Sequence, residues 1–183
     1  MTMDQGPGQG FETKFVRLGE EVRVTDGTVI EGYASLFWVT DQGGDVVSAG
    51  AYAASLARLR AAGRGVKMLW QHDPGEPIGV WDEVREDARG LYVRGRLLPE
   101  VARAREAAAL IGAGAIDGLS IGYRTVKAEK DGKGRRLLRE LELWEVSLVT
   151  FPMLAEARVA AKADAALAAE IGALTEAVRE ARA

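Results

Sequence analysis

The 183-residue chain has the size of one folded domain with an appendage, and its 48% hydrophobic and 28% charged residues are typical of a globular protein. The formal net charge of −3 is small and the lysines and arginines are scattered, which argues against a nucleic-acid surface or a polybasic membrane anchor. The absence of cysteine and the single histidine exclude disulfides, a thiolate nucleophile, and cysteine-based or multi-histidine metal sites. We expect no cofactor.

The first ten residues, rich in glycine, glutamine and proline, are predicted to be disordered. They lack a basic start followed by an apolar run, so no signal peptide is expected. No apolar stretch approaches the roughly 18 residues that a membrane-spanning helix requires. These features predict a protein of a reducing cytoplasm with no membrane partner.

From residue 12 onwards, alternating apolar residues predict strands, and two stretches with helical spacing interrupt them. Turn-forming residues separate the elements, and Thr25-Asp26-Gly27-Thr28 and Asp87-Ala88-Arg89-Gly90 are each expected to close a hairpin. In chain order, we predict strands over 12–25 and 29–38, a helix over 50–62, strands over 66–72, 78–85 and 91–98, a helix over 100–111, and strands over 116–127 and 135–151.

Two of these elements carry further expectations. Ser48 is expected to cap the N-terminus of the first helix. In the strand over 66–72, the alternating residues from Val66 to His72 are expected to share one face, and Asp73-Pro74-Gly75 to end the strand. The whole pattern predicts an α+β fold, a mostly antiparallel sheet that is curled or closed into a β-barrel, with two or three helices around it.

After Pro152 the composition shifts towards alanine and mixed charges, which predicts an Ala-rich C-terminal helix. We therefore divide the chain into a disordered segment (1–10), a β-barrel domain (11–152) and a helical tail (153–183). Four apolar residues of the tail follow a 4-3-4 spacing that begins a heptad seam: Leu167, Ile171, Leu174 and Val178. The tail either docks on the domain or on a second subunit, or it engages a partner or is trimmed off.

The segment Gly118-Leu119-Ser120-Ile121-Gly122 has the G-x-S-x-G pattern of an exposed nucleophilic serine. In a chain with 22 glycines, the alternative is an ordinary serine in a glycine-rich strand with a bulge. The α/β-hydrolases that commonly carry this pattern place their histidine after the serine. Here the only histidine, His72, precedes Ser120, so that fold is excluded.

His72 is the one side chain that can act as a base near neutral pH without a large pKa shift, and a serine nucleophile needs such a base. It lies at the end of a predicted strand, where a side chain can reach a cleft. The alternative is a histidine that only packs at the rim of the core.

Glu145 lies in a strongly apolar strand and is the candidate third member of a catalytic triad. Alternation places it on the face of Leu141 and Leu143, and places Glu142 on the opposite face. A buried carboxylate needs a partner, and accepting a proton from His72 would supply one and orient the imidazole. The alternative is a carboxylate at a strand edge that reaches water or pairs with arginine.

Four segments in this order resemble the HK97-type prohead maturation proteases of tailed phages and related gene-transfer particles. They are Glu31-Gly32-Tyr33-Ala34-Ser35-Leu36-Phe37, Leu69-Trp70-Gln71-His72-Asp73, Gly118-Leu119-Ser120-Ile121-Gly122-Tyr123 and Trp144-Glu145-Val146-Ser147-Leu148-Val149-Thr150-Phe151-Pro152. The resemblance implies a fold related to the herpesvirus assemblins, with His72 as base, Ser120 as nucleophile and Glu145 as third member.

The same resemblance implies a serine endopeptidase that acts in the host or bacterial cytoplasm, inside the assembling procapsid. Its substrates would be scaffold or the N-terminal segment of the capsid protein, and also the protease itself. We expect a homodimer or higher oligomer that binds no nucleic acid. Two rival functions remain open, a non-catalytic assembly module that binds capsid or scaffold, and a small-ester hydrolase that uses the same residues.

Overall fold

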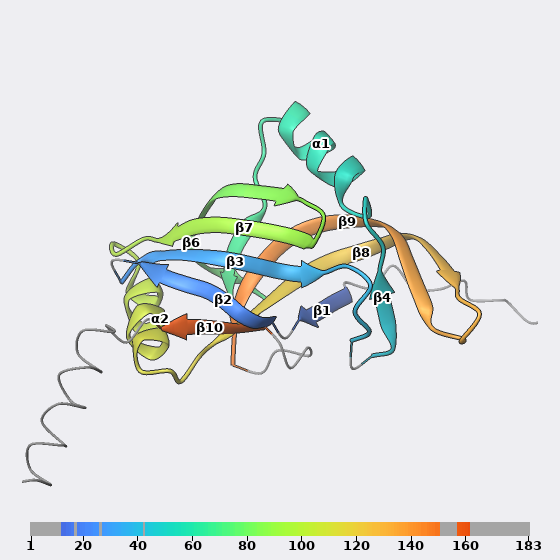
Figure 1. The fold of residues 1–183 in the computed structure, drawn as a ribbon. Helices are drawn as coiled ribbons and strands as arrows, with labels where there is room; N and C mark the ends of the chain where they lie inside the picture. The colour runs from blue at the N-terminus through green and yellow to red at the C-terminus, as the bar shows by residue number, and fades with distance from the viewer. Residues whose placement is uncertain (1–11, 17, 26, 42, 151–156, 162–183) are drawn as a thin grey trace, which may run out of the picture.

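The computed structural model describes residues 12–16, 18–25, 27–41, 43–150 and 157–161 (Figure 1). Within them, strands dominate and two helices flank the sheet. The elements are β1 (Glu12–Val16), β2 (Leu18–Thr25), β3 (Val29–Leu36), β4 (Asp45–Val47), α1 (Ala53–Ala61), β5 (Lys67–Trp70), β6 (Asp73–Glu86), β7 (Gly90–Leu97), α2 (Ala102–Gly112), β8 (Gly118–Lys130), β9 (Arg136–Val149) and β10 (Ala157–Ala161).

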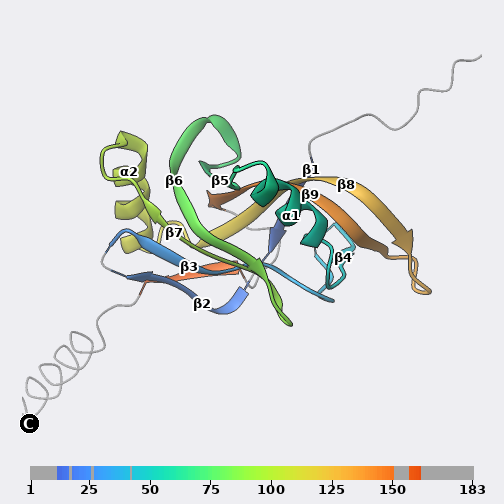
Figure 2. The same ribbon diagram turned by 90° about the horizontal axis from the view of Figure 1, so that it is seen from above.

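All the strands belong to one mixed sheet in the order β1-β8-β9-β5-β6-β7-β3-β2-β10, with β4 paired to β9 beside this path. Chain neighbours such as β2 and β3, β6 and β7, and β8 and β9 pair antiparallel. Parallel pairing joins β5 and β4 to β9, and β10 to β2. The sheet curls around its inner face, and α1 and α2 lie apart over different parts of it (Figures 1 and 2). This confirms the predicted α+β class with a curled sheet.

The core fills the inside of this curl because the strands alternate apolar residues towards it. On β8, Leu119, Ile121 and Tyr123 belong to the core cluster and are almost fully buried. The helix α2 adds Ala107 and Ile111 to the same cluster. One continuous core therefore supports the central strands β8, β9 and β5.

The predicted hairpins at residues 25–28 and 87–90 are confirmed by the pairing of β2 with β3 and of β6 with β7. In the second turn, the Asp87 N–H donates to the Gly90 carbonyl at 3.0 Å. Gly90 is required there, since a Cβ atom at this position would lie 2.0 Å from the carbonyl oxygen of Ser35.

Several local predictions are wrong, among them that Asp73-Pro74-Gly75 is a break, since these residues begin β6. The helix α1 is preceded by Tyr52 as its N-cap, and Ser48 instead donates its hydroxyl to the Leu138 carbonyl at 3.0 Å. Residues 157–161, expected to be helical, form β10 along β2, because unpaired main-chain groups of β2 offer ladder hydrogen bonds there. The strand predicted over 66–72 ends at Trp70.

The rest of the predicted helical tail, with its apolar seam, lies outside the described residues. Neither α1 nor α2 is long and apolar enough to cross a membrane, and the same holds for every other helical stretch in the described part of the chain.

Candidate active site

His72 is placed by a two-residue hairpin turn between β5 and β6. Trp70 pairs with Asp73, so Gln71 and His72 are the two central residues of the turn. Their φ angles are 52° and 63°, as in the primed turns that close such hairpins. The predicted alternation from Val66 to His72 therefore stops at Trp70, and the imidazole is directed by the turn instead of by a strand face.

This turn costs conformational free energy, because each non-glycine residue in the left-handed region is disfavoured by about 1 kcal/mol or more. Hydrogen bonds to the end of β9 offset that cost. The Gln71 N–H donates to the Leu148 carbonyl at 2.9 Å, and the His72 N–H donates to the Ser147 hydroxyl at 3.1 Å. The Gln71 side-chain amide donates to the Thr150 hydroxyl at 2.6 Å. His72 is thus anchored to β9 through its own main chain.

Ser120 lies within β8, opposite Ser147 on β9. Its neighbours Leu119 and Ile121 point into the core, so the serine points to the other face of the sheet. Gly118 and Gly122, two residues away on either side, share that face because strand residues alternate. Since neither glycine has a side chain, the G-x-S-x-G pattern leaves space around the Ser120 hydroxyl for the imidazole.

Glu145 reaches the face of Ser120 because β9 contains a bulge. Glu145 pairs with Gly122 and Leu143 pairs with Tyr123, which leaves Trp144 as an extra residue. Such an insertion reverses the alternation of side chains. Leu143 and Val146 both belong to the core, so the prediction that Glu145 shares a face with Leu141 and Leu143 is wrong.

The structure brings the three predicted residues together. The imidazole of His72 lies between two partners, with Nε2 2.6 Å from Ser120 Oγ and Nδ1 2.6 Å from Glu145 Oε1. The Ser147 hydroxyl donates to Glu145 Oε2 at 2.5 Å, so both oxygens of the carboxylate act as acceptors. Nδ1 then carries the proton, and Nε2 is left to accept the proton of the serine hydroxyl.

The site is closed over Ser120 and open beside His72. Ser120 is fully buried, and the side chain of His72 is 13% exposed. Beside Ser120, β8 is paired with β1, in which Phe15 is the residue opposite the serine. On the β5 side, the imidazole borders a cavity of about 370 Å³ whose walls also include Leu69, Pro74 and Trp144.

Glu142, the other carboxylate of this segment, is not part of the site. It forms two hydrogen bonds with the guanidinium of Arg124, at 2.9 and 2.6 Å, on the exposed surface. Ser147 and Gln71, in contrast, support the site and were not singled out in the sequence. The spacing of Glu145 and Ser147, two residues apart on one strand, was the available signal for Ser147.

Comparisons with known proteins identify the family of the chain. A family model described as caudovirus prohead serine protease matches residues 16–170. The prohead protease of Enterobacteria phage HK97 is 38% identical over 136 residues, which are 73% of this chain and 59% of that protein. The chain therefore matches about three fifths of the length of this relative.

Two solved structures are similar. The bacteriophage T4 capsid assembly protease has a TM-score of 0.61 and 17% identity, covering 78% of this chain and 98% of that one. The varicella-zoster virus protease has a TM-score of 0.41 and 14% identity, covering 69% and 60%. The T4 structure supports the curled-sheet fold. Since the family model extends over most of the sequence, the chain belongs to the caudovirus prohead serine protease family.

Proposed function

We propose that this protein is a serine endopeptidase that cleaves capsid or scaffold protein during prohead maturation, with Ser120 as nucleophile, His72 as base and Glu145 as the residue that orients the base. One observation carries the proposal. Both ring nitrogens of His72 are engaged at 2.6 Å, one by the Ser120 hydroxyl and the other by the Glu145 carboxylate. That is the arrangement that acyl transfer by a serine requires.

In the proposed mechanism, His72 Nε2 takes the proton of the Ser120 hydroxyl as Oγ attacks the carbonyl carbon of the scissile peptide bond. The imidazolium then returns this proton to the leaving amine. A water molecule repeats the sequence on the acyl-enzyme and releases the acid. Glu145 keeps the imidazole in the productive tautomer and stabilises its positive charge, while backbone N–H groups stabilise the oxyanion.

A macromolecular substrate inside the procapsid is supported by family membership and by the printed name of the HK97 relative, a prohead protease. Ser120 has no exposed surface. The residues packed around it must therefore move before a substrate peptide can reach Oγ. A partner that binds tightly can drive such a rearrangement through its differential affinity for the open form.

The decisive test is co-expression with the cognate capsid and scaffold proteins, followed by mass spectrometry of the products. We expect the wild-type chain to produce defined fragments, and Ser120→Ala to produce none because it lacks the nucleophilic oxygen. The matched control is Ser48→Ala, a buried serine whose hydroxyl bonds only the Leu138 carbonyl among the contacts described. Complete processing by Ser120→Ala would remove the nucleophile assignment.

The non-catalytic assembly module predicts a different outcome of the same experiment. In that case Ser120→Ala and the wild type would bind capsid or scaffold equally well and leave both uncleaved. A small-ester hydrolase would turn over short acyl esters and leave both proteins intact.

A further inference from the structure

We propose that Ser147 is a positioning residue of the active site, whose hydroxyl holds both the main chain of His72 and the side chain of Glu145. This inference rests on the proposed function of the three neighbouring residues and adds a fourth group that touches two of them. Nothing in the pattern of a nucleophile, a base and an acid requires it.

The hydroxyl of Ser147 both accepts and donates a hydrogen bond. Its oxygen accepts the His72 N–H at 3.1 Å, and its proton is donated to Glu145 Oε2 at 2.5 Å. The side chain has no exposed surface. One buried hydroxyl therefore links the main chain of the base directly to the side chain that orients its ring.

The His72 N–H needs this partner. In a two-residue hairpin, the ladder hydrogen bonds are made by the residues that flank the turn, so the N–H of the second central residue points away from the ladder. The positive φ of His72, 63°, is strained for a histidine. By accepting this N–H, Ser147 stabilises the backbone conformation that carries the imidazole over β9.

The Glu145 carboxylate needs it as well. Oε1 receives the proton of His72 Nδ1 at 2.6 Å, and the carboxylate is almost completely buried. A second donor on Oε2 fixes the rotation of the carboxylate plane and shares the buried charge. Without it, the carboxylate can turn away from Nδ1, and the imidazole loses its preferred tautomer.

The test is the steady-state cleavage of the substrate identified by co-expression, made with Ser147→Ala. We expect kcat to fall about 10- to 100-fold with KM little changed, the loss typical of a misplaced catalytic group. The matched control is Ser55→Ala. Ser55 is also buried and its hydroxyl also accepts a backbone N–H of β9, that of Leu143 at 2.9 Å, so it reports on a lost structural hydrogen bond alone.

A double-mutant comparison separates positioning from general loss of structure. Because Ser147 acts in part through Glu145, Ser147→Ala combined with Glu145→Gln should be faster than the product of the two separate losses in kcat predicts. If Ser147 had only a structural role, the losses in kcat of the two single variants would multiply. Thermal unfolding of each variant by circular dichroism establishes that the folded protein is being compared.

Proton NMR tests the proposal without any substrate. His72 is the only histidine of the chain, so its downfield Nδ1–H signal can be assigned directly in a proton NMR spectrum. We expect Ser147→Ala to shift or broaden this signal and Ser55→Ala to leave it unchanged. An unchanged signal and an unchanged kcat in Ser147→Ala would overturn the inference, whereas a wild-type protein that cleaves nothing would count against the proposed function alone.

Discussion

The Glu145 carboxylate is almost completely buried in the sheet, where its oxygens contact His72 Nδ1 and the Ser147 hydroxyl. Because a carboxylate accepts from Nδ1 and an amide can donate to it, Glu145→Gln favours the wrong tautomer of His72. We expect kcat to fall about 10³- to 10⁴-fold, as for the same change in other serine-protease triads. The cleavage rate of the capsid or scaffold substrate measures this.

Glu142→Gln is the control for this prediction. It makes the same chemical change three residues away, in a carboxylate that pairs with Arg124 at the surface. We expect its cleavage rate to stay within a few-fold of the wild type, since exposed ion pairs contribute little. A larger loss in Glu142→Gln than in Glu145→Gln would transfer the third role to Glu142.

Two of the three residues that meet in the structure could be selected from the sequence because few residues of their kind compete with them. The chain has a single histidine and one serine in a G-x-S-x-G pattern, whereas Glu145 shares its strand with Glu140 and Glu142. The backbone conformation of the turn that directs the His72 imidazole could not be predicted. Glutamine and histidine have no strong preference for positive φ, and the turn forms because β9 supplies partners for its N–H groups.

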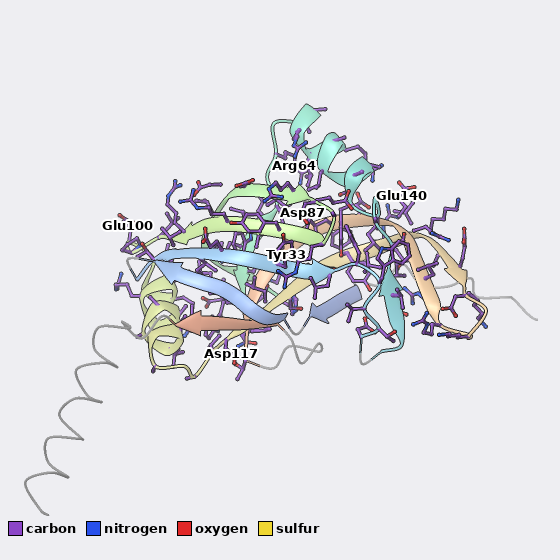
Figure 3. The ribbon with its side chains drawn as sticks, viewed as in Figure 1. Tyr33, Arg64, Asp87, Glu100, Asp117 and Glu140 are labelled. Atoms are coloured by element: carbon purple, nitrogen blue, oxygen red, sulfur yellow. The ribbon has the colours of Figure 1, made fainter. Side chains whose placement is uncertain are left out.

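The hairpin of β6 and β7 shows how a turn is stabilised by a carboxylate. Asp87 accepts the Tyr33 hydroxyl at 2.7 Å, the Arg85 guanidinium at 2.7 Å, and the N–H groups of Arg89 and Gly90 at 2.8 and 3.2 Å. Figure 3 labels Tyr33 on β3 and Asp87 at this turn. Burial alone would raise the pKa of the Asp87 carboxyl, but these hydrogen bonds outweigh burial and lower the pKa below its ordinary value.

A pH-dependent stability follows from this lowered pKa. The stabilisation is fully present above the pKa of an unfolded aspartate, about 3.9, and is lost as the pH falls through the lower folded value. In Asp87→Asn it is absent, so the difference in unfolding free energy between wild type and variant should be greatest above about pH 4 and shrink below it. Urea unfolding between pH 2.5 and 7 measures this.

Tyr33→Phe supplies an independent check on the same carboxylate. It removes one donor to Asp87 and keeps the ring, so it should show a smaller pH-dependent loss of the same sign. A difference between wild type and Asp87→Asn that stays constant with pH would contradict the role given to Asp87.

Strands with regular alternation were predicted well, and irregular ones were not. The hairpin of β2 with β3 follows its local turn residues and keeps one register throughout. The bulge at Trp144 and the parallel pairing of β5 with β9 depend on contacts between segments far apart in the chain. Periodicity holds no information about such partners, so the face of Glu145 could not be derived from it.

The sheet and both helices share a single core, so we expect the described domain to unfold in one transition. Leu91 is fully buried on β7, and Leu91→Ala should lower the free energy of unfolding by about 2–5 kcal/mol through lost burial and the cavity left behind. Leu110→Ala, the same change on the partly exposed face of α2, should cost less than about 1 kcal/mol. Urea unfolding followed by circular dichroism and by tryptophan fluorescence measures both.

Two transitions instead of one, or equal losses in the two leucine variants, would contradict a shared core. The division into a segment over 1–10, a domain over 11–152 and a tail over 153–183 stays a prediction, as do the expected oligomer and the role of the tail. These properties involve surfaces that meet other molecules, and apolar spacing alone does not identify the partner.

Ser120, Glu145 and the turn that carries His72, the three residues proposed for catalysis, lie on β8, on β9 and after β5, which are adjacent in the sheet although far apart in the chain. The register of the strand pairing sets the distances between these residues, whereas the lengths of the connecting loops do not. Insertions in the loops at residues 98–101 or 131–135 should therefore leave the catalytic rate largely unchanged. One residue added or removed between Trp144 and Ser147 would turn Glu145 or Ser147 to the wrong side of β9.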